Sequence, residues 1–124
     1  MKKLAIVGTR DPAQYNFTYE DFVKKVTPLF ENGEYDIIVS GGADGIDSYA
    51  AKFAQENGYT LIEFLPEWER YGKAAGPKRN EQIVKAADHV VAIYDGKSKG
   101  TASSVALAKK ANKYRRTFFL YPPK

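Results

Sequence analysis

Residues 35–47 are Tyr35-Asp36-Ile37-Ile38-Val39-Ser40-Gly41-Gly42-Ala43-Asp44-Gly45-Ile46-Asp47. A short apolar run ends at Val39, and a glycine-rich loop follows it directly. Apolar residues then recur at the i, i+3, i+4, i+7 and i+8 spacing of a helix, at Ile46, Tyr49, Ala50, Phe53 and Ala54. Asn57-Gly58 is a typical helix end. A buried strand, a tight loop and a helix in this order form the basic unit of a parallel sheet covered by helices.

The same pattern continues on both sides of this segment. Further short apolar strands are predicted at 4–7, 60–65, 89–94 and 117–121, with Pro122-Pro123 ending the last. Further helices are predicted from a capping box at Thr18 to Asn32, from Pro77 to about Ala87, and from Thr101 to Asn112. Pro28 should kink or loosen the last turn of the first helix. Residues 67–77 are predicted to be a loop.

Five strands that alternate with four helices predict an α/β fold. We expect a Rossmann-like three-layer sandwich, with a five-stranded, mainly parallel sheet in the order 3-2-1-4-5 and about four helices on both faces. Residues 1–124 should form a single domain, because two halves would each be too small to bury a core. Ligands of such sheets bind beyond the carboxyl ends of the strands. This rule selects the loops at 8–10, 40–47 and 95–101.

The composition excludes several kinds of chemistry. The chain has no cysteine and one histidine, His89, so disulfides, thiolate or histidine metal clusters and a Ser-His triad are excluded. We therefore expect no metal and no cofactor. No apolar run is long enough to cross a bilayer, and the run after Lys3 is too short for a signal peptide. A cytoplasmic protein without a membrane partner is expected.

Charge is distributed unevenly along the chain. Residues 1–70 hold seven basic and twelve acidic side chains, whereas residues 71–124 hold twelve basic and three acidic ones. The second half is therefore at +9 and the first at −5. This asymmetry indicates an anionic partner, either a phosphorylated small molecule or a nucleic-acid backbone. The alternative for Lys109, Lys110 and Lys113 is a solvated lysine-rich helix face.

The glycine loop is a candidate anion site. Glycine lets a backbone approach a ligand closely, and the helix that follows offers free N–H groups to a phosphate. Arg10, directly after the first strand, could reach the same cleft as a bidentate partner, and Asp47 could accept hydrogen bonds from a ribose. The alternative is an ordinary strand-to-helix turn with Asp44 as N-cap and Asp47 completing a box-like pair.

The loop at 95–101 is a second candidate anion site because it combines Lys97, Lys99 and hydroxyl groups with a helix N-terminus. The alternative is a mobile charged loop. The third helix could add Arg79 and Asn80. The predicted ligand-binding residues are Gly8, Thr9, Arg10, Ser40, Gly41, Gly42, Ala43, Gly45, Asp47, Arg79, Asn80, Asp95, Ser98, Lys99, Gly100 and Thr101.

Several aromatic residues allow two interpretations. Trp68 and Tyr71 could stack on a base or form a lid, but a lone loop tryptophan more often fixes its loop to the body or to another subunit. His89 is interpreted as structural, and Phe118 and Phe119 as core residues.

Four segments, at 8–10, 40–47, 76–80 and 95–101, together resemble the SLOG superfamily. The resemblance is closest to its small YspA- or YpsA-related members and spans nearly the whole chain. It implies a Rossmannoid domain that binds nucleotides or nucleotide-derived signals.

Two other branches of this superfamily imply different functions. The loop from Ser40 to Asp47 also resembles that of DprA, which binds single-stranded DNA. The LOG branch hydrolyses the N-glycosidic bond of nucleoside monophosphates. Gly100-Thr101 matches the LOG signature, but its proline-glycine-glycine is replaced by residues 95–99 and its glutamate by Ser104. A serine cannot supply the carboxylate that stabilises an oxocarbenium-like transition state.

The sequence therefore favours a binding module for a phosphorylated, nucleotide-like small molecule. LOG-like hydrolysis is the first alternative, with Arg79 matching the LOG arginine and Asp47, Glu81 or Asp95 in place of its glutamate. The second alternative is a DprA-like module for single-stranded nucleic acid, ranked last because no basic run is interleaved with aromatic residues. Whether the protein is an enzyme, and whether it forms a homodimer or a higher homo-oligomer, is left open.

Overall fold

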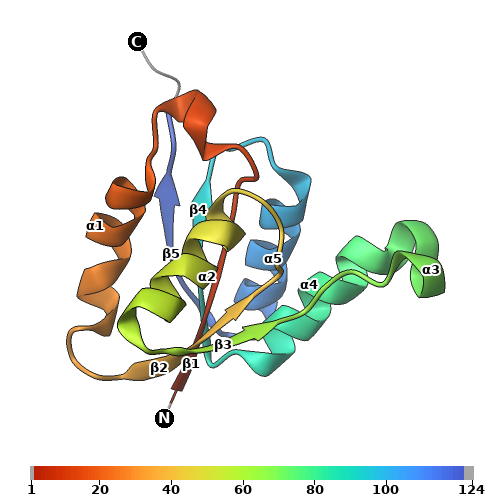
Figure 1. Cartoon of the computed structure of the whole chain (residues 1–124). Coiled ribbons are helices and arrows are strands. Elements are labelled where there is room, and N and C mark those ends of the chain that lie inside the picture. Colours follow the sequence, from red (N-terminus) through yellow and green to blue (C-terminus); the bar gives the residue numbers. More distant parts are fainter. Residues whose placement is uncertain (1, 122–124) are drawn as a thin grey trace.

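The first strand lies at the centre of a five-stranded sheet in the computed structural model, which describes residues 2–121 (Figure 1). All four strand pairs are parallel, and the order β3-β2-β1-β4-β5 confirms the predicted 3-2-1-4-5. The strands are β1 (Lys2–Gly8), β2 (Tyr35–Ser40), β3 (Thr60–Glu63), β4 (His89–Tyr94) and β5 (Tyr114–Phe119). The order reverses at β1, where its two neighbours, β2 and β4, diverge.

Helices cover both faces of the sheet, as predicted (Figure 1). Leu4 and Ile6 point to the face packed by α1 (Tyr19–Phe30) and α2 (Ile46–Asn57). The alternate residues of β1 point to the opposite face, which is covered by α4 (Ala75–Ala86) and α5 (Lys99–Lys110). Because β1 is buried on both faces, its sequence is continuously apolar rather than alternating.

The two helices that flank β2 in the sequence, α1 and α2, begin and end largely as their sequences predict. Thr18 and Asp21 form the predicted capping box of α1, and the helix continues past Pro28 to Phe30. Gly58 ends α2 in the left-handed conformation at φ 74°.

The segment predicted to be a loop, residues 67–77, is helical instead. It contains α3 (Trp68–Tyr71), a 3-10 turn (Gly72–Ala74) and the start of α4, and it extends from the body as an arm (Figure 1). A left-handed Gly72, at φ 55°, ends α3 and allows the chain to enter the next turn. Pro77 is tolerated because it lies in the first turn of α4, where an N–H needs no helical partner.

The end of the chain also differs from prediction. β5 starts three residues earlier than expected, because Tyr114 already pairs with Val90. Phe119 is 55% exposed, so its assignment to the core is wrong, whereas Phe118 is half-buried. The physical reason is that β5 is an edge strand with incomplete cover. Pro122-Pro123 lies outside the described residues.

The last helix ends earlier than Asn112, which is left-handed at φ 59°. Lys113 does not belong to a solvated lysine face, because its Nζ donates to the carbonyl oxygens of Val84 and Lys85 at 2.9 and 3.1 Å. None of the helices within residues 2–121 is long and apolar enough to cross a bilayer.

A polar cluster closes the amino end of the sheet. The Tyr35 hydroxyl lies 2.6 Å from Nδ1 of His89 and also accepts from Arg115, whose guanidinium donates to Glu34 at 2.9 Å. His89 thus has a structural partner, as expected.

Gly45 joins the loop after β1 to the start of α2. It has φ 75°, and a Cβ there would collide with the carbonyl groups of Thr9 and Arg10. Gly45→Ala should therefore lower the free energy of unfolding by about 2 kcal/mol or more. Gly76→Ala, a helical position with open space, should change it by less than about 1 kcal/mol. Urea denaturation measures both, and equal effects would contradict the prediction.

Candidate functional site

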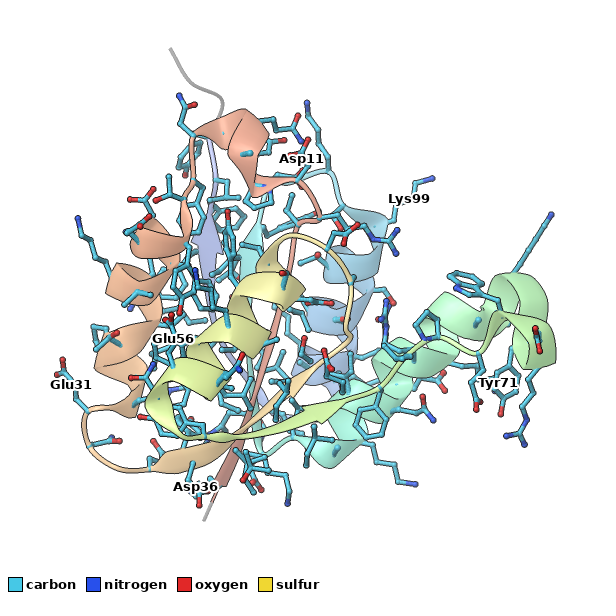
Figure 2. All side chains as sticks on the ribbon, viewed as in Figure 1. Asp11, Glu31, Asp36, Glu56, Tyr71 and Lys99 are labelled. Atoms are coloured by element: carbon cyan, nitrogen blue, oxygen red, sulfur yellow. The ribbon has the colours of Figure 1, made fainter. Side chains whose placement is uncertain are left out.

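Three loops meet at the carboxyl edge of the sheet, and Thr9 joins them. Its backbone N–H donates to the carbonyl of Ile93 at 3.1 Å, and its own carbonyl accepts from the N–H of Ile46 at 3.1 Å. Its hydroxyl accepts from the N–H of Asp95, also at 3.1 Å. The loops after β1, β2 and β4 are therefore held together, as the sequence predicts. Figure 2 shows Asp11 and Lys99 at this edge.

The loop after β2 is built on glycine geometry. Gly42 and Gly45 have φ values of 68° and 75°, which favour glycine. The N-cap of α2 is Gly45 and no side chain caps the helix, so the alternative with Asp44 as cap is wrong. Asp47 does not complete a capping box either. Its Oδ2 turns back over the loop and accepts from the N–H of Ala43 at 3.1 Å.

Arg79 connects α4 to this loop. Its side chain is only 8% exposed, and Nη1 donates to the carbonyl of Gly41 at 2.6 Å. Nε donates to Oδ1 of Asn80 at 3.1 Å, and the Asn80 amide in turn donates to the carbonyl of Gly100 at 3.4 Å. Nη2 donates to no group within residues 2–121. A buried arginine with one unused nitrogen can bind an anion.

The loop after β4 is braced by Asp95. Its Oδ1 accepts from the N–H groups of Lys97 and Ser98, both at 2.9 Å, and its Oδ2 accepts from the Tyr15 hydroxyl at 3.0 Å. Partial burial raises the pKa of this carboxyl, but these hydrogen bonds outweigh burial and lower it overall. Ser98 caps α5 by accepting from the N–H of Thr101 at 3.3 Å. These hydrogen bonds hold the loop in place, which argues against the alternative of a mobile charged loop.

Three adjoining cavities open at this edge. The central cavity, about 250 Å³, lies between the loops and α4, and is lined by Val7, Gly8, Arg10, Ala43, Asp47, Arg79, Asn80, Ile83, Ser98, Lys99, Gly100, Thr101 and Ser104. The arm cavity, about 250 Å³, is lined by Arg10, Gly41, Gly42, Ala43, Asp44, Pro66, Trp68 and Arg79. The outer cavity, about 390 Å³, is lined by Thr9, Arg10, Asp11, Gln14, Tyr15, Asp95, Lys97 and Ser98.

The predicted ligand-binding residues line these cavities, with two exceptions. Ser40 is buried beneath the loop, with its hydroxyl 3.5 Å from the N–H of Gly42. Gly45 packs against the Arg10 carbonyl.

The candidate catalytic residues do not all lie in one cavity. Arg79 and Asp47 share the central cavity, whereas Glu81 is exposed and lines a different groove between α4 and α5.

Ile83 and Ser104 also line the central cavity but are not among the predicted ligand-binding residues, although the LOG resemblance places Ser104 at a catalytic position. Ile83 lies one turn after Arg79 on α4, and Ser104 lies one turn after Thr101 on α5. Helical spacing places each pair on one face, so projecting the predicted residues by three or four positions would have found both.

The carboxylate of Asp47, when ionised, would repel an anion in the central cavity. It is 7% exposed, and burial raises its pKa, although the Ala43 N–H and the nearby Arg79 act in the opposite direction. Burial also lowers the pKa of Arg79, while Asp47 acts to raise it. Within residues 2–121, Asp47 is the only carboxylate lining this cavity, against the basic groups Arg10, Arg79 and Lys99.

The chain is similar to known proteins along most of its length. Residues 1–67 match the model of the family DNA recombination-mediator protein A. The Gene 61 protein of Mycobacterium phage D29 is 37% identical over 81 residues, which cover 60% of this chain and 65% of that protein.

Two solved structures share the fold. DNA processing protein A from Helicobacter pylori, described for its single-stranded DNA binding mode, superposes with a TM-score of 0.69 at 26% identity, over 95% of this chain and 64% of that one. DprA from Streptococcus pneumoniae gives 0.61 at 20% identity, over 96% of this chain and 50% of that one. The chain thus spans less than two thirds of each of these three proteins.

Replacing Asp47 tests its electrostatic role. The raised pKa means that the native state holds this proton more tightly than the unfolded chain, so ionisation of Asp47 costs stability as pH rises above about 4. Asp47→Asn keeps an oxygen for the Ala43 N–H but cannot ionise. The stability of the variant relative to the wild type should therefore increase from about pH 4 to pH 7. Urea denaturation across this range measures it, and a constant or shrinking difference would contradict the assignment.

Proposed function

Because the chain belongs to the DNA recombination-mediator protein A family, we propose that this SLOG-type domain binds single-stranded DNA by its phosphates at the carboxyl edge of the sheet. The comparisons favour this function over the phosphorylated small molecule that the sequence alone places first. The Helicobacter pylori relative is described as a single-stranded DNA binder, which supports the proposal by similarity.

One observation carries the proposal. Arg10 lines the central, arm and outer cavities, so all three adjoin one exposed arginine. A single nucleotide needs one such cavity. A strand presents successive phosphates and bases, and a row of adjoining cavities suits it better.

The central cavity offers donors for a phosphate. The N–H groups of Lys99 and Gly100, at the start of α5, have no acceptor within residues 2–121. Nη2 of Arg79 and the side chain of Arg10 add unused donors to the same space. A helix N-terminus and a guanidinium with free nitrogens are both strong phosphate partners, and Arg10, unpaired within the described residues, is free to bind through two of its nitrogens. The surplus of basic residues after residue 70 supplies long-range attraction to DNA.

A phosphorylated, nucleotide-like small molecule is the second candidate ligand. The observation that favours it is the position of Asp47 on the wall of the central cavity, where its carboxylate could accept a hydrogen bond from a ribose hydroxyl. DNA lacks the 2′-hydroxyl. Hydrolysis of such a ligand in the central cavity would use Asp47, because Ser104 stands where LOG proteins have glutamate and Asp47 is the one carboxylate that lines this cavity within residues 2–121.

Arg10→Ala tests strand binding. It removes a cation that has no hydrogen-bond or ion-pair partner within residues 2–121, so the fold should be unaffected. Affinity for an oligothymidylate of about 20 nucleotides should fall about tenfold at low salt, and the slope of log K against log salt should decrease by about one. Fluorescence anisotropy measures both.

Arg116→Ala is the matched control, because it removes the same charge from an exposed position on β5 that lines none of the three cavities. Equal loss in both variants would show that net charge rather than the site governs binding. No binding by the wild-type protein at low salt would refute the proposal.

The second candidate ligand is distinguished by competition. If the site serves a strand, nucleoside monophosphates should displace the oligonucleotide only at concentrations far above its own dissociation constant. Tight monophosphate binding that depends on Asp47, or release of free base that is lost in Asp47→Asn, would favour the second candidate.

A further inference from the structure

Trp68 is the one tryptophan of the chain, and the fold does not bury it. It lies at the start of α3 on the arm and is 55% exposed. A tryptophan that fixes its loop to the body would be covered by other side chains, yet Trp68 takes part in none of the aromatic pairs within residues 2–121. At this exposure Trp68 contributes little to fixing the arm to its own domain.

Trp68 lines the arm cavity, whose other walls carry two arginines and one carboxylate, that of Asp44. The backbone of Gly41 and Gly42 forms one wall, and Arg10 and Arg79 form another. Leu65, 61% exposed, lies against Gly42. This cavity shares both arginines with the central cavity. An aromatic face thus stands directly beside the proposed phosphate site.

We propose that Trp68 is a stacking platform for a nucleobase of the bound strand, next to the phosphate held by Arg10 and Arg79. The inference rests on the proposed function and adds a base subsite to it. A strand alternates charged phosphates with flat apolar bases, and the arm cavity offers both kinds of wall. Base stacking on an aromatic ring tolerates every base, so the platform adds affinity without sequence preference.

The same arrangement favours single strands over duplexes. In a duplex each base is already stacked and paired, so it must be extruded at an energetic cost before it can lie on an indole. Unpaired bases avoid that cost.

Tyr71 provides a matched control on the same arm. The side chains of Arg70 and Lys78 lie over its ring, at 5.0 and 5.9 Å from the centroid, and it lines none of the three cavities. Figure 2 shows it at the outer part of the arm, away from the carboxyl edge. A base on the arm cavity would therefore contact Trp68 and not Tyr71.

The experiment uses two labelled probes of equal length, an oligothymidylate and its abasic counterpart, which has the same phosphates but no bases. Trp68→Ala should weaken binding of the oligothymidylate about tenfold by anisotropy and leave the abasic probe unchanged. Trp68→Phe should retain most of the affinity, and Tyr71→Ala should behave as the wild type. Unlabelled oligothymidylate should quench the fluorescence of the single tryptophan, whereas the abasic strand should not.

The possible failures are distinguishable. Wild-type affinity in Trp68→Ala, together with no quenching, would overturn the platform and leave strand binding in place. Equal weakening of both probes would mean that Trp68 only positions the arm, and would also overturn the platform. If neither probe binds the wild-type protein, the proposed function itself fails.

Discussion

The site depends on the close approach of two backbones at the switch in strand order. The chain leaving β1 lies against the chain entering α2, so closely that only glycine fits at position 45. The hydrogen bond from the N–H of Ile46 to the Thr9 carbonyl fixes this contact, and the Thr9 hydroxyl extends it to the loop after β4. Three loops from distant parts of the sequence are thereby held together at the carboxyl edge of the sheet.

Much of this arrangement could be predicted from the sequence because it follows from local rules. Continuous apolar runs indicated the buried strands, their alternation with helices indicated a parallel sheet, and the order followed from the Rossmann-like fold class. The cap at Thr18 and the stop at Gly58 are encoded within a few residues. Prediction failed at the arm and at β5, where packing against the rest of the fold determines the secondary structure. Gly72 and Pro77 looked like loop residues but serve as a helix end and a first-turn residue.

The candidate site was predictable to a similar extent. Glycine loops at strand ends indicated where a ligand would bind, but not which side chains are buried there. Arg79 illustrates the difference, because its bond to the Gly41 carbonyl joins residues far apart in the sequence and sets the wall between two cavities. The role of Asp47 was also hidden. Its sequence position suggested helix capping, whereas the folded chain directs it at the Ala43 N–H and buries it.

The uncovered position of β5 has a consequence for solubility. An outer strand has backbone groups that can pair with another polypeptide, and such pairing is how sheet proteins aggregate. Here the strand has adjacent arginines, Arg115 and Arg116, both exposed. If two copies of β5 paired edge to edge, their arginines would lie close together in a poorly hydrated interface. These two cations therefore help to protect a border that the rest of the fold leaves open, and removing both together should be seen first as precipitation rather than as unfolding.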